Sequence, residues 1–451
     1  MITLFETLAM AVSLYMLLNI IARMTNNKKL HFALTVFLLA SIFSLLLMIL
    51  YSDSFGTHFD SMLSINQFSS LISLMITFGM LLVQFIAYSE PVYQDFSLLS
   101  SFSFFGMLLV IMSTSILTLF IGLELLTIPT VISLLLSRKW LEAGIKYFVV
   151  VALSAGLFAF GAATFFLLNG NLQITAQNTA GDIIALLFFV VAIGIESGIF
   201  PFNLWIPDVY QGSPGFITSM LGGLNKKVGI VALIYIMLVI FPYISQNLLI
   251  FFAVLTMFYG NLAALMQKNV KRILAYSSIS QVGYILIGLS TLGRYGLSAS
   301  IFQIFAHMFA FIGIFAVIAL LETKGRIETK DYIGLNSENK FMALTLSVLL
   351  LSMAGIPFTA GFVGKFLLFS SAVYSNLVWL AILGIINTVI SVYYYAKIII
   401  AVYTNKKDAR HVRADFSISF AALASLAIII FFGVYPAPMI SLAQAAAAIL
   451  I

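Results

Sequence analysis

The stretch FMALTLSVLLLSMAGIPFTAGFVGKFLLFSSAV, residues 341–373, decides the fold of this chain, and Lys365 is its only charged residue. At roughly 1.5 Å per residue, a straight helix over this run would be about 50 Å long, too long for one crossing of about 30 Å of hydrocarbon. Gly355 and Pro357 lie in its middle, where glycine loosens the turn and proline removes a backbone donor. The run therefore predicts a membrane helix that breaks inside the bilayer.

Similar apolar runs recur along the whole chain, which is 62% hydrophobic and only 8% charged. This composition predicts an all-α polytopic membrane protein forming a single membrane domain, 1–451, with about fourteen transmembrane helices. The first run lacks a basic leader and a clear cleavage site, so we expect a retained helix. The expected spans are 2–22, 30–50, 66–88, 97–113, 115–136, 144–168, 182–205, 216–240, 247–267, 272–290, 298–321, 341–372, 377–403 and 417–434.

A second span is interrupted in the same way. In the segment from Ile183 to Pro207, around the seventh expected helix, Glu196 is followed by Pro201 and Pro207. Two Gly/Pro-interrupted segments in corresponding positions indicate inverted repeats around a transport site. We therefore expect two five-helix repeats, helices 4–8 and 9–13, with helices 7 and 12 broken. The expected divisions are N-terminal helices 1–3 at 1–96, the first repeat at 97–240, the second at 247–403, and helix 14 with the tail at 404–451.

Basic residues predict the orientation of the chain. With the loops numbered after each span, odd loops hold most of the 22 basic residues, whereas even loops hold only Arg294. Because basic loops stay in the cytoplasm, both termini are expected outside. The basic residues of the odd loops are Arg23, Lys28, Lys29, Arg138, Lys139, Lys146, Lys268, Lys271, Arg272, Lys324, Arg326, Lys330, Lys340, Lys406, Lys407, Arg410 and Arg413.

Several classes of chemistry are excluded by composition. The chain has no cysteine, so cysteine-ligated iron–sulfur clusters, disulfides and thiol chemistry are excluded within it. Its four histidines are scattered, without metal-ligand or haem spacing. No phosphate loop, dinucleotide fingerprint or catalytic triad is present. We expect no cofactor, metal or redox centre in this chain. The net charge of +6 is explained by membrane topology better than by nucleic acid.

A few charges lie inside apolar runs, where they are costly and usually mark an ion path. Buried carboxylates and lysines can exchange protons, and histidine can bridge such steps. Each of these residues also has a purely structural interpretation. A carboxylate can form an ion pair, a buried histidine can be hydrogen-bonded in the core, and a lysine can extend its ammonium to the membrane interface. Adjacent helical residues point about 100° apart, so Lys226 and Lys227 cannot both face one partner. The candidate relay residues are Glu124, Glu196, Lys226, Lys227, His307 and Lys365; the candidate helix breaks are Pro201, Pro207, Gly355 and Pro357.

Five stretches carry a family resemblance when taken in order. They are GLELLTIP (122–129), EAGIKYFVVVALSAGLFAFG (142–161), FPFNLWIPDVYQGSPG (200–215), YGNLAALMQKNVKRILAYSSISQVGYILIG (259–288) and AGIPFTAGFVGKF (354–366). The chain resembles the antiporter-like membrane subunits of respiratory complex I and related complexes, and within them the subunit N type of NADH-quinone oxidoreductase. The resemblance implies a fourteen-helix fold with broken helices 7 and 12.

The resemblance also implies roles for particular residues. The family relay matches Glu124 on helix 5, Lys226 or Lys227 on helix 8, and Lys365 on helix 12. The family lysine on helix 7, five residues before the Pro-Phe-x-x-Trp motif, is replaced by Glu196. Two neighbouring carboxylates repel, so one would stay protonated. Gln281 likewise replaces a frequent family histidine.

The leading hypothesis is a proton-translocating subunit in the membrane arm of a complex I-like quinone oxidoreductase. Quinone, flavin and iron–sulfur clusters are expected in partner subunits, and the chain is expected in a prokaryotic plasma membrane. One alternative is a cation/proton antiporter subunit of an Mrp-type or hydrogenase-type complex. Another is a structural membrane subunit that anchors a complex without pumping, an alternative that the Glu196 replacement leaves standing.

Overall fold

The computed structural model describes residues 4–52, 54–176, 182–405 and 412–451. The predicted loop residues Lys406, Lys407 and Arg410 lie outside these ranges. Nearly all of the described chain is helical, which confirms the all-α polytopic prediction. Among the described residues, twelve helices are long and apolar enough to cross a membrane. The two remaining expected spans are the two interrupted segments, each divided between two shorter helices.

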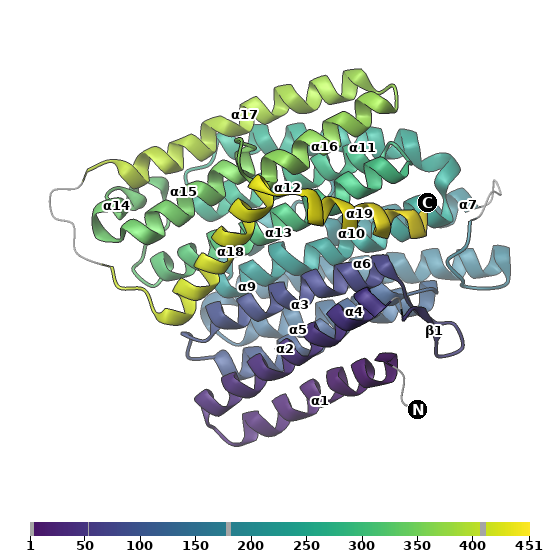
Figure 1. Ribbon diagram of the computed structural model, residues 1–451, viewed down its shortest axis with the longest axis horizontal. Coiled ribbons are helices and arrows are strands. Elements are labelled where there is room, and N and C mark those ends of the chain that lie inside the picture. Colours follow the sequence, from purple (N-terminus) through teal and green to yellow (C-terminus); the bar gives the residue numbers. More distant parts are fainter. Residues whose placement is uncertain (1–3, 53, 177–181, 406–411) are drawn as a thin grey trace. The chain divides into compact units, whose positions relative to one another are not determined.

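The chain divides into two compact units. Unit 1 comprises 1–197, 224–245 and 445–451; unit 2 comprises 198–223 and 246–444. The predicted repeats stay a prediction. Within unit 1, helices α2 to α5 lie side by side (Figure 1). The elements of unit 1 are α1 (Leu4–Met24), α2 (Lys28–Ser52), β1 (Gly56–His58), β2 (Leu63–Ile65), α3 (Gln67–Ala87), α4 (Tyr93–Met112), α5 (Ile116–Leu135), η1 (Arg138–Trp140), α6 (Leu141–Asn169), α7 (Asp182–Ser197), α10 (Lys226–Ile234) and η3 (Tyr235–Ile240).

Small residues set the packing of α4 against α5. A Cβ on Gly106 would lie 2.4 Å from the backbone nitrogen of Leu126, and one on Gly122 would lie 2.8 Å from that of Val110. Side chains at these positions would force the two helices apart. Close backbone approach of this kind is how membrane helices gain van der Waals contact where lipid offers no hydrophobic drive. The packing holds α5, and with it Glu124, in a fixed place.

Unit 2 is arranged around α13, which is buried along its length and packs against α9, α12, α15, α16 and α18. The π-helical turn η2 (Leu221–Asn225) joins α9 to α10 across the division between the units. The elements of unit 2 are α8 (Trp205–Gly212), α9 (Gly215–Met220), α11 (Pro242–Leu265, from residue 246), α12 (Val270–Leu289), α13 (Arg294–Glu322), η4 (Thr329–Tyr332), α14 (Leu335–Glu338), α15 (Lys340–Ala354), α16 (Ala360–Tyr374), α17 (Val378–Tyr403), α18 (Phe416–Val434) and most of α19 (Ala437–Leu450).

The stretch 341–373 breaks where the sequence predicts. Helix α15 ends at Ala354, and Gly355 caps it with a φ of +87°, in the left-handed region that favours glycine. Helix α16 begins at Ala360, so Pro357 lies in the gap. The capping glycine and the proline together explain why the apolar run forms two helices.

The seventh expected span is also interrupted. Helix α7 ends at Ser197, Gly198 follows with a φ of +77°, and α8 begins at Trp205. Pro201 lies in this gap. Pro207 lies within the first turn of α8. Backbone N–H groups in the first turn make no hydrogen bond within the helix, so a proline there costs none.

Two features were not predicted. A small antiparallel hairpin, β1 with β2, lies in the connection between α2 and α3 and pairs Gly56 with Ile65. After α18 the chain forms a further apolar helix, α19, where the sequence indicated only a tail. Both are too short for the periodicity of a membrane span to identify them.

Candidate functional site

Lys365 lies at the break between α15 and α16. Its side chain is 3% exposed, and Nζ donates to the carbonyl oxygens of Met353 at 3.0 Å and Ala354 at 3.1 Å. These carbonyls belong to the last turn of α15, where helix termination leaves them without helical donors. A cation is also favourable at the negative end of a helix dipole. The lysine therefore supplies the polar partner that a broken membrane helix requires.

Two glutamines extend this polar group onto neighbouring helices of unit 2. Gln281 of α12 donates from Nε2 to the Met353 carbonyl at 3.0 Å, so it shares an acceptor with Lys365. Gln303 of α13 donates from Nε2 to Gln281 Oε1 at 2.9 Å. Both glutamines are buried. Sequence reasoning noted Gln281 only as a replacement and missed Gln303, an uncharged amide inside an apolar run.

His307 lies on α13, one turn after Gln303, and is buried. Its ring centroid is 5.6 Å from that of Phe311. The structure thus places His307 and Lys365, the two relay candidates of the second expected repeat, in the interior of unit 2.

The two candidate carboxylates lie in unit 1 and are close enough to interact electrostatically. Glu196 is buried near the end of α7, and α10 approaches it closely: a Cβ on Gly229 would lie 2.9 Å from the Glu196 carbonyl carbon. Glu124 is half-buried on α5. It lines two shallow surface hollows whose other walls are apolar side chains, among them Ile128 and Phe148. Glu196 is therefore an interior residue, whereas Glu124 lies at the surface of this chain.

Lys226 and Lys227 occupy the first two positions of α10, and each is 1% exposed. A structural interpretation had one of them reach the membrane interface; both side chains are instead enclosed by the chain. The two lysines also lie close enough to interact with each other. A π-helical turn, η2, directly precedes them, and such turns often occur at functional sites.

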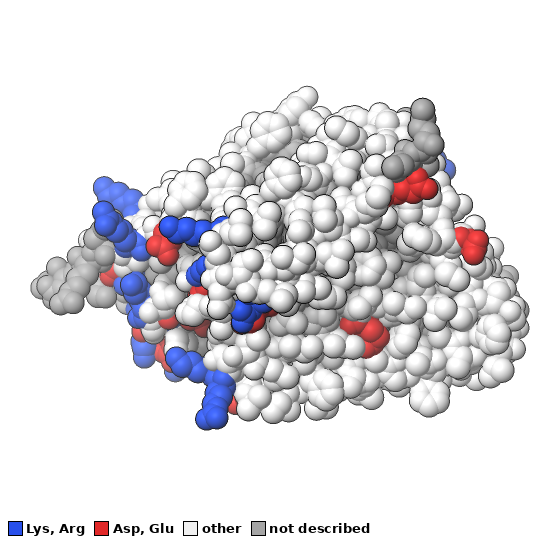
Figure 2. All heavy atoms as spheres, turned by 90° about the horizontal axis from the view of Figure 1, so that it is seen from below, with Lys and Arg blue, Asp and Glu red and all other residues white. Residues whose placement is uncertain are grey.

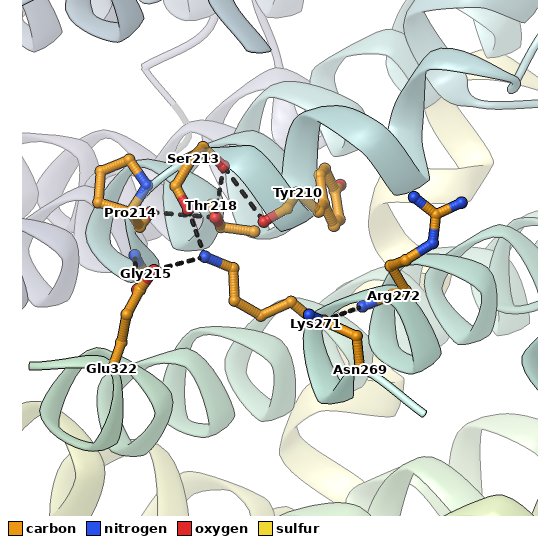
Figure 3. A network of polar contacts seen from close by, with 9 residues as sticks. All are labelled: Tyr210, Ser213, Pro214, Gly215, Thr218, Asn269, Lys271, Arg272 and Glu322. Atoms are coloured by element: carbon orange, nitrogen blue, oxygen red, sulfur yellow. Dashed lines mark hydrogen bonds and ion pairs between the residues drawn. The ribbon is translucent and has the colours of Figure 1, made fainter. Parts of the chain in front are cut away.

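Lys271 was assigned to a loop, and the structure corrects that assignment too. It lies in the first turn of α12 and is 6% exposed. Figure 3 shows its Nζ donating to Glu322 Oε1 of α13 at 2.8 Å and to the carbonyl of Ser213. Glu322 Oε2 also accepts from the backbone N–H of Gly215, which begins α9. One ion pair thus joins α12, α13 and the connection between α8 and α9.

No group of three or more His, Cys, Asp or Glu side chains that could hold a metal ion occurs in the described part of the chain. The polar groups that the fold collects are lysines, single carboxylates, amides and helix-end carbonyls. Of these groups, lysines and carboxylates can bind and release protons, and carboxylate and carbonyl oxygens are ligands for small hard cations. On the face shown in Figure 2, charged side chains gather mainly at one end and leave a broad uncharged area, which fits a chain surrounded by lipid and apolar partners.

Fold and site together define a polytopic, all-helical membrane protein of the antiporter-like class. Residues 113–391 match the family described as "NADH:quinone oxidoreductase/Mrp antiporter, TM". The chain belongs to this family.

Named relatives and solved structures agree with this assignment. The chain is 35% identical to NADH-quinone oxidoreductase subunit N of Trichlorobacter lovleyi over 76% of its own length and 75% of the relative's. It is 32% identical to F(420)H(2) dehydrogenase subunit N of Methanosarcina mazei, covering 92% and 90% of the two chains. A chain of respiratory complex I from Thermus thermophilus superimposes with a TM-score of 0.86 at 26% identity, covering 96% of this chain and 98% of that one.

Proposed function

We propose that this chain is a proton-translocating subunit in the membrane arm of a complex I-like quinone oxidoreductase. The observation that carries the proposal is the position of Lys365, whose ammonium holds the free carbonyls at the broken end of α15. A protonated lysine can donate to both carbonyls, whereas a neutral amine is a much weaker donor. Gain and loss of a proton would therefore change the contacts at the break.

The proposed relay has two groups. In unit 1, Glu124 and Glu196 accept protons, and Lys226 or Lys227 carries positive charge; in unit 2, His307 and Lys365 do so. Moving one unit charge against 100 mV costs about 2.3 kcal/mol. Because this chain has no cysteine for an iron–sulfur cluster, the redox energy would come from partner subunits that hold quinone, flavin and clusters.

Glu124 supports the presence of a partner subunit. It lies about nine residues into α5, roughly 14 Å from the start of the helix and so near mid-membrane. Glu124 lines hollows whose other walls are apolar side chains. A carboxylate facing hydrocarbon is costly, so another membrane subunit with a polar or basic group would cover this face. We place the assembly in a prokaryotic plasma membrane with both termini outside.

A second candidate function rests on the presence of two carboxylates, Glu124 and Glu196, in unit 1. Carboxylate oxygens suit hard cations, so an Mrp-type or hydrogenase-type antiporter subunit that moves sodium against protons would use the same fold. A third role is that the chain anchors the complex without pumping. This alternative rests on Glu196, which stands where the family has a lysine.

The test is proton pumping by the intact complex in sealed vesicles, with Lys365→Ala in this chain and electron transfer followed in parallel. We expect the number of protons moved per electron to fall sharply while the complex remains assembled. Lys397→Ala is the control, because Lys397 lies near one end of α17 and is partly exposed. Unchanged pumping in Lys365→Ala would remove Lys365 from the path and favour the anchoring role. Replacing sodium in the buffer distinguishes the antiporter alternative.

A further inference from the structure

A cluster of uncharged polar side chains lies beside Lys365 and has no role in the relay described above. At its centre is Tyr284 of α12, whose ring centroid is 4.6 Å from Lys365 Nζ. The Tyr284 hydroxyl oxygen accepts a hydrogen bond from Asn261 Nδ2 of α11 at 3.2 Å and another from Asn387 Nδ2 of α17 at 3.2 Å. The phenol is thus held from two neighbouring helices.

The two asparagines are themselves fixed. Asn261 Nδ2 also donates to the backbone carbonyl of Asn387 at 2.7 Å, and Asn261 Oδ1 accepts from the Tyr394 hydroxyl at 2.8 Å. All four side chains are buried. The cluster therefore joins α11, α12 and α17 through direct hydrogen bonds rather than through loose contacts.

Such a cluster is expensive to place in a membrane interior. Each buried amide or hydroxyl costs free energy unless it is hydrogen-bonded. The arrangement converges on a single phenol oxygen. With two N–H donors on that oxygen, a swing of the side chain about χ1 would break both bonds, so the ring stays beside Lys365. In this position the ring turns its face to the ammonium of Lys365.

The face of an aromatic ring attracts a cation, and the attraction is strongest where water is excluded. A neutral amine gains no comparable attraction. A fixed ring therefore affects how firmly Lys365 holds its proton, and through the Met353 and Ala354 carbonyls it affects the break between α15 and α16.

We propose that Asn261, Asn387 and Tyr394 are positioning residues that hold the Tyr284 ring against the ammonium of Lys365. This inference rests on the proposed function, since it assigns the cluster to the ion-transfer step that Lys365 performs. Tyr284 contacts the lysine directly, whereas the other three residues act through Tyr284.

The experiment compares Tyr284→Leu, Tyr284→Phe and Asn261→Leu in the intact complex, with proton pumping measured per assembled complex. We expect Tyr284→Leu, which removes the ring, to lower pumping roughly threefold to tenfold, in keeping with loss of a desolvated cation–π contact. Tyr284→Phe keeps the ring but loses its tether, so the loss is smaller. Tyr393→Leu is the matched control, because Tyr393 is a 64% exposed tyrosine on α17.

A double-mutant cycle separates positioning from general packing. If Asn261 acts through the Tyr284 hydroxyl, Asn261→Leu lowers pumping in the parent chain and has no further effect in the Tyr284→Phe background. Equal losses in both backgrounds would overturn the positioning role. Equal pumping by Tyr284→Leu and Tyr284→Phe would also overturn it. Phenylalanine keeps the aromatic ring and leucine does not, so equal pumping would mean that the ring itself has no effect.

Lys365→Ala is measured in the same series. Loss of pumping in Lys365→Ala with normal pumping in Tyr284→Leu would overturn this inference and leave the proposed function standing. Normal pumping in Lys365→Ala would overturn the proposed function of that lysine, and the inference with it.

Discussion

Gly355 shows how one residue governs the candidate site. It ends α15 in a left-handed conformation, and a Cβ placed on it would lie 3.0 Å from Lys365 Cδ. Glycine is therefore needed twice: for its backbone angle, and for the space that the lysine stem occupies. The same contact explains why the sequence signal at 354–366 combines a glycine, a proline and a lysine.

We expect Gly355→Ala to reduce pumping while the complex still assembles. The left-handed conformation costs an L-residue about 1–2 kcal/mol, and the added methyl group pushes the lysine stem away from the Met353 and Ala354 carbonyls. Gly170→Ala is the control, since Gly170 also has a positive φ, +70°, but a Cβ there would meet nothing within 4 Å. An equal loss of pumping in the two variants would show that backbone strain alone causes the loss. Normal pumping in Gly355→Ala would contradict the prediction.

Single residues also show where sequence reasoning succeeds and where it does not. Lys365 and Glu196 could be found because a charge inside an apolar run is costly enough to need a reason. Gln303, Asn261 and Asn387 carry no charge, and one amide barely lowers the hydrophobicity of a span. Their importance comes from hydrogen bonds between helices distant in the sequence, which no local pattern reveals.

At the scale of elements, the Lys271–Glu322 pair joins three segments of unit 2 (Figure 3). Lys271 was assigned to a loop because helix boundaries in the sequence are uncertain by a few residues. Its position in the first turn of α12 instead places the ammonium against the Ser213 carbonyl, at the connection that leads into α9. We therefore expect this ion pair to hold the start of α9 in place, unlike a solvent-exposed ion pair.

Glu322→Gln should lower the thermal midpoint of the purified complex. The amide can still accept from the Gly215 N–H, but Lys271 loses its counterion while it remains buried, at a cost of about 1–3 kcal/mol. Adding Lys271→Met removes the uncompensated charge, so the double variant should be more stable than Glu322→Gln alone. A double variant that loses the sum of both single losses would contradict the ion-pair explanation.

For the whole molecule, the apolar composition and the two Gly/Pro breaks were sufficient to predict the all-helical membrane fold. The sequence predicted even the division of the run 341–373 into two helices. It did not predict the hairpin β1–β2 or α19, because short elements stabilised by tertiary contacts leave weak local signals. The inverted repeats and the orientation of the chain in the membrane remain predictions, since neither follows from the contacts within one unit.

The orientation can be measured directly because the chain contains no cysteine. Single cysteines at exposed loop positions can then be labelled with a membrane-impermeant maleimide, without any background from the chain itself. Lys324→Cys lies after α13 in a basic loop, and Asn171→Cys lies after α6 in a loop without basic residues. If basic loops face the cytoplasm, intact cells label Asn171→Cys and inside-out vesicles label Lys324→Cys. The opposite result would invert the orientation. Labelling of both positions from the same side would mean that the chain crosses the membrane an even number of times between them, whereas the predicted number is odd.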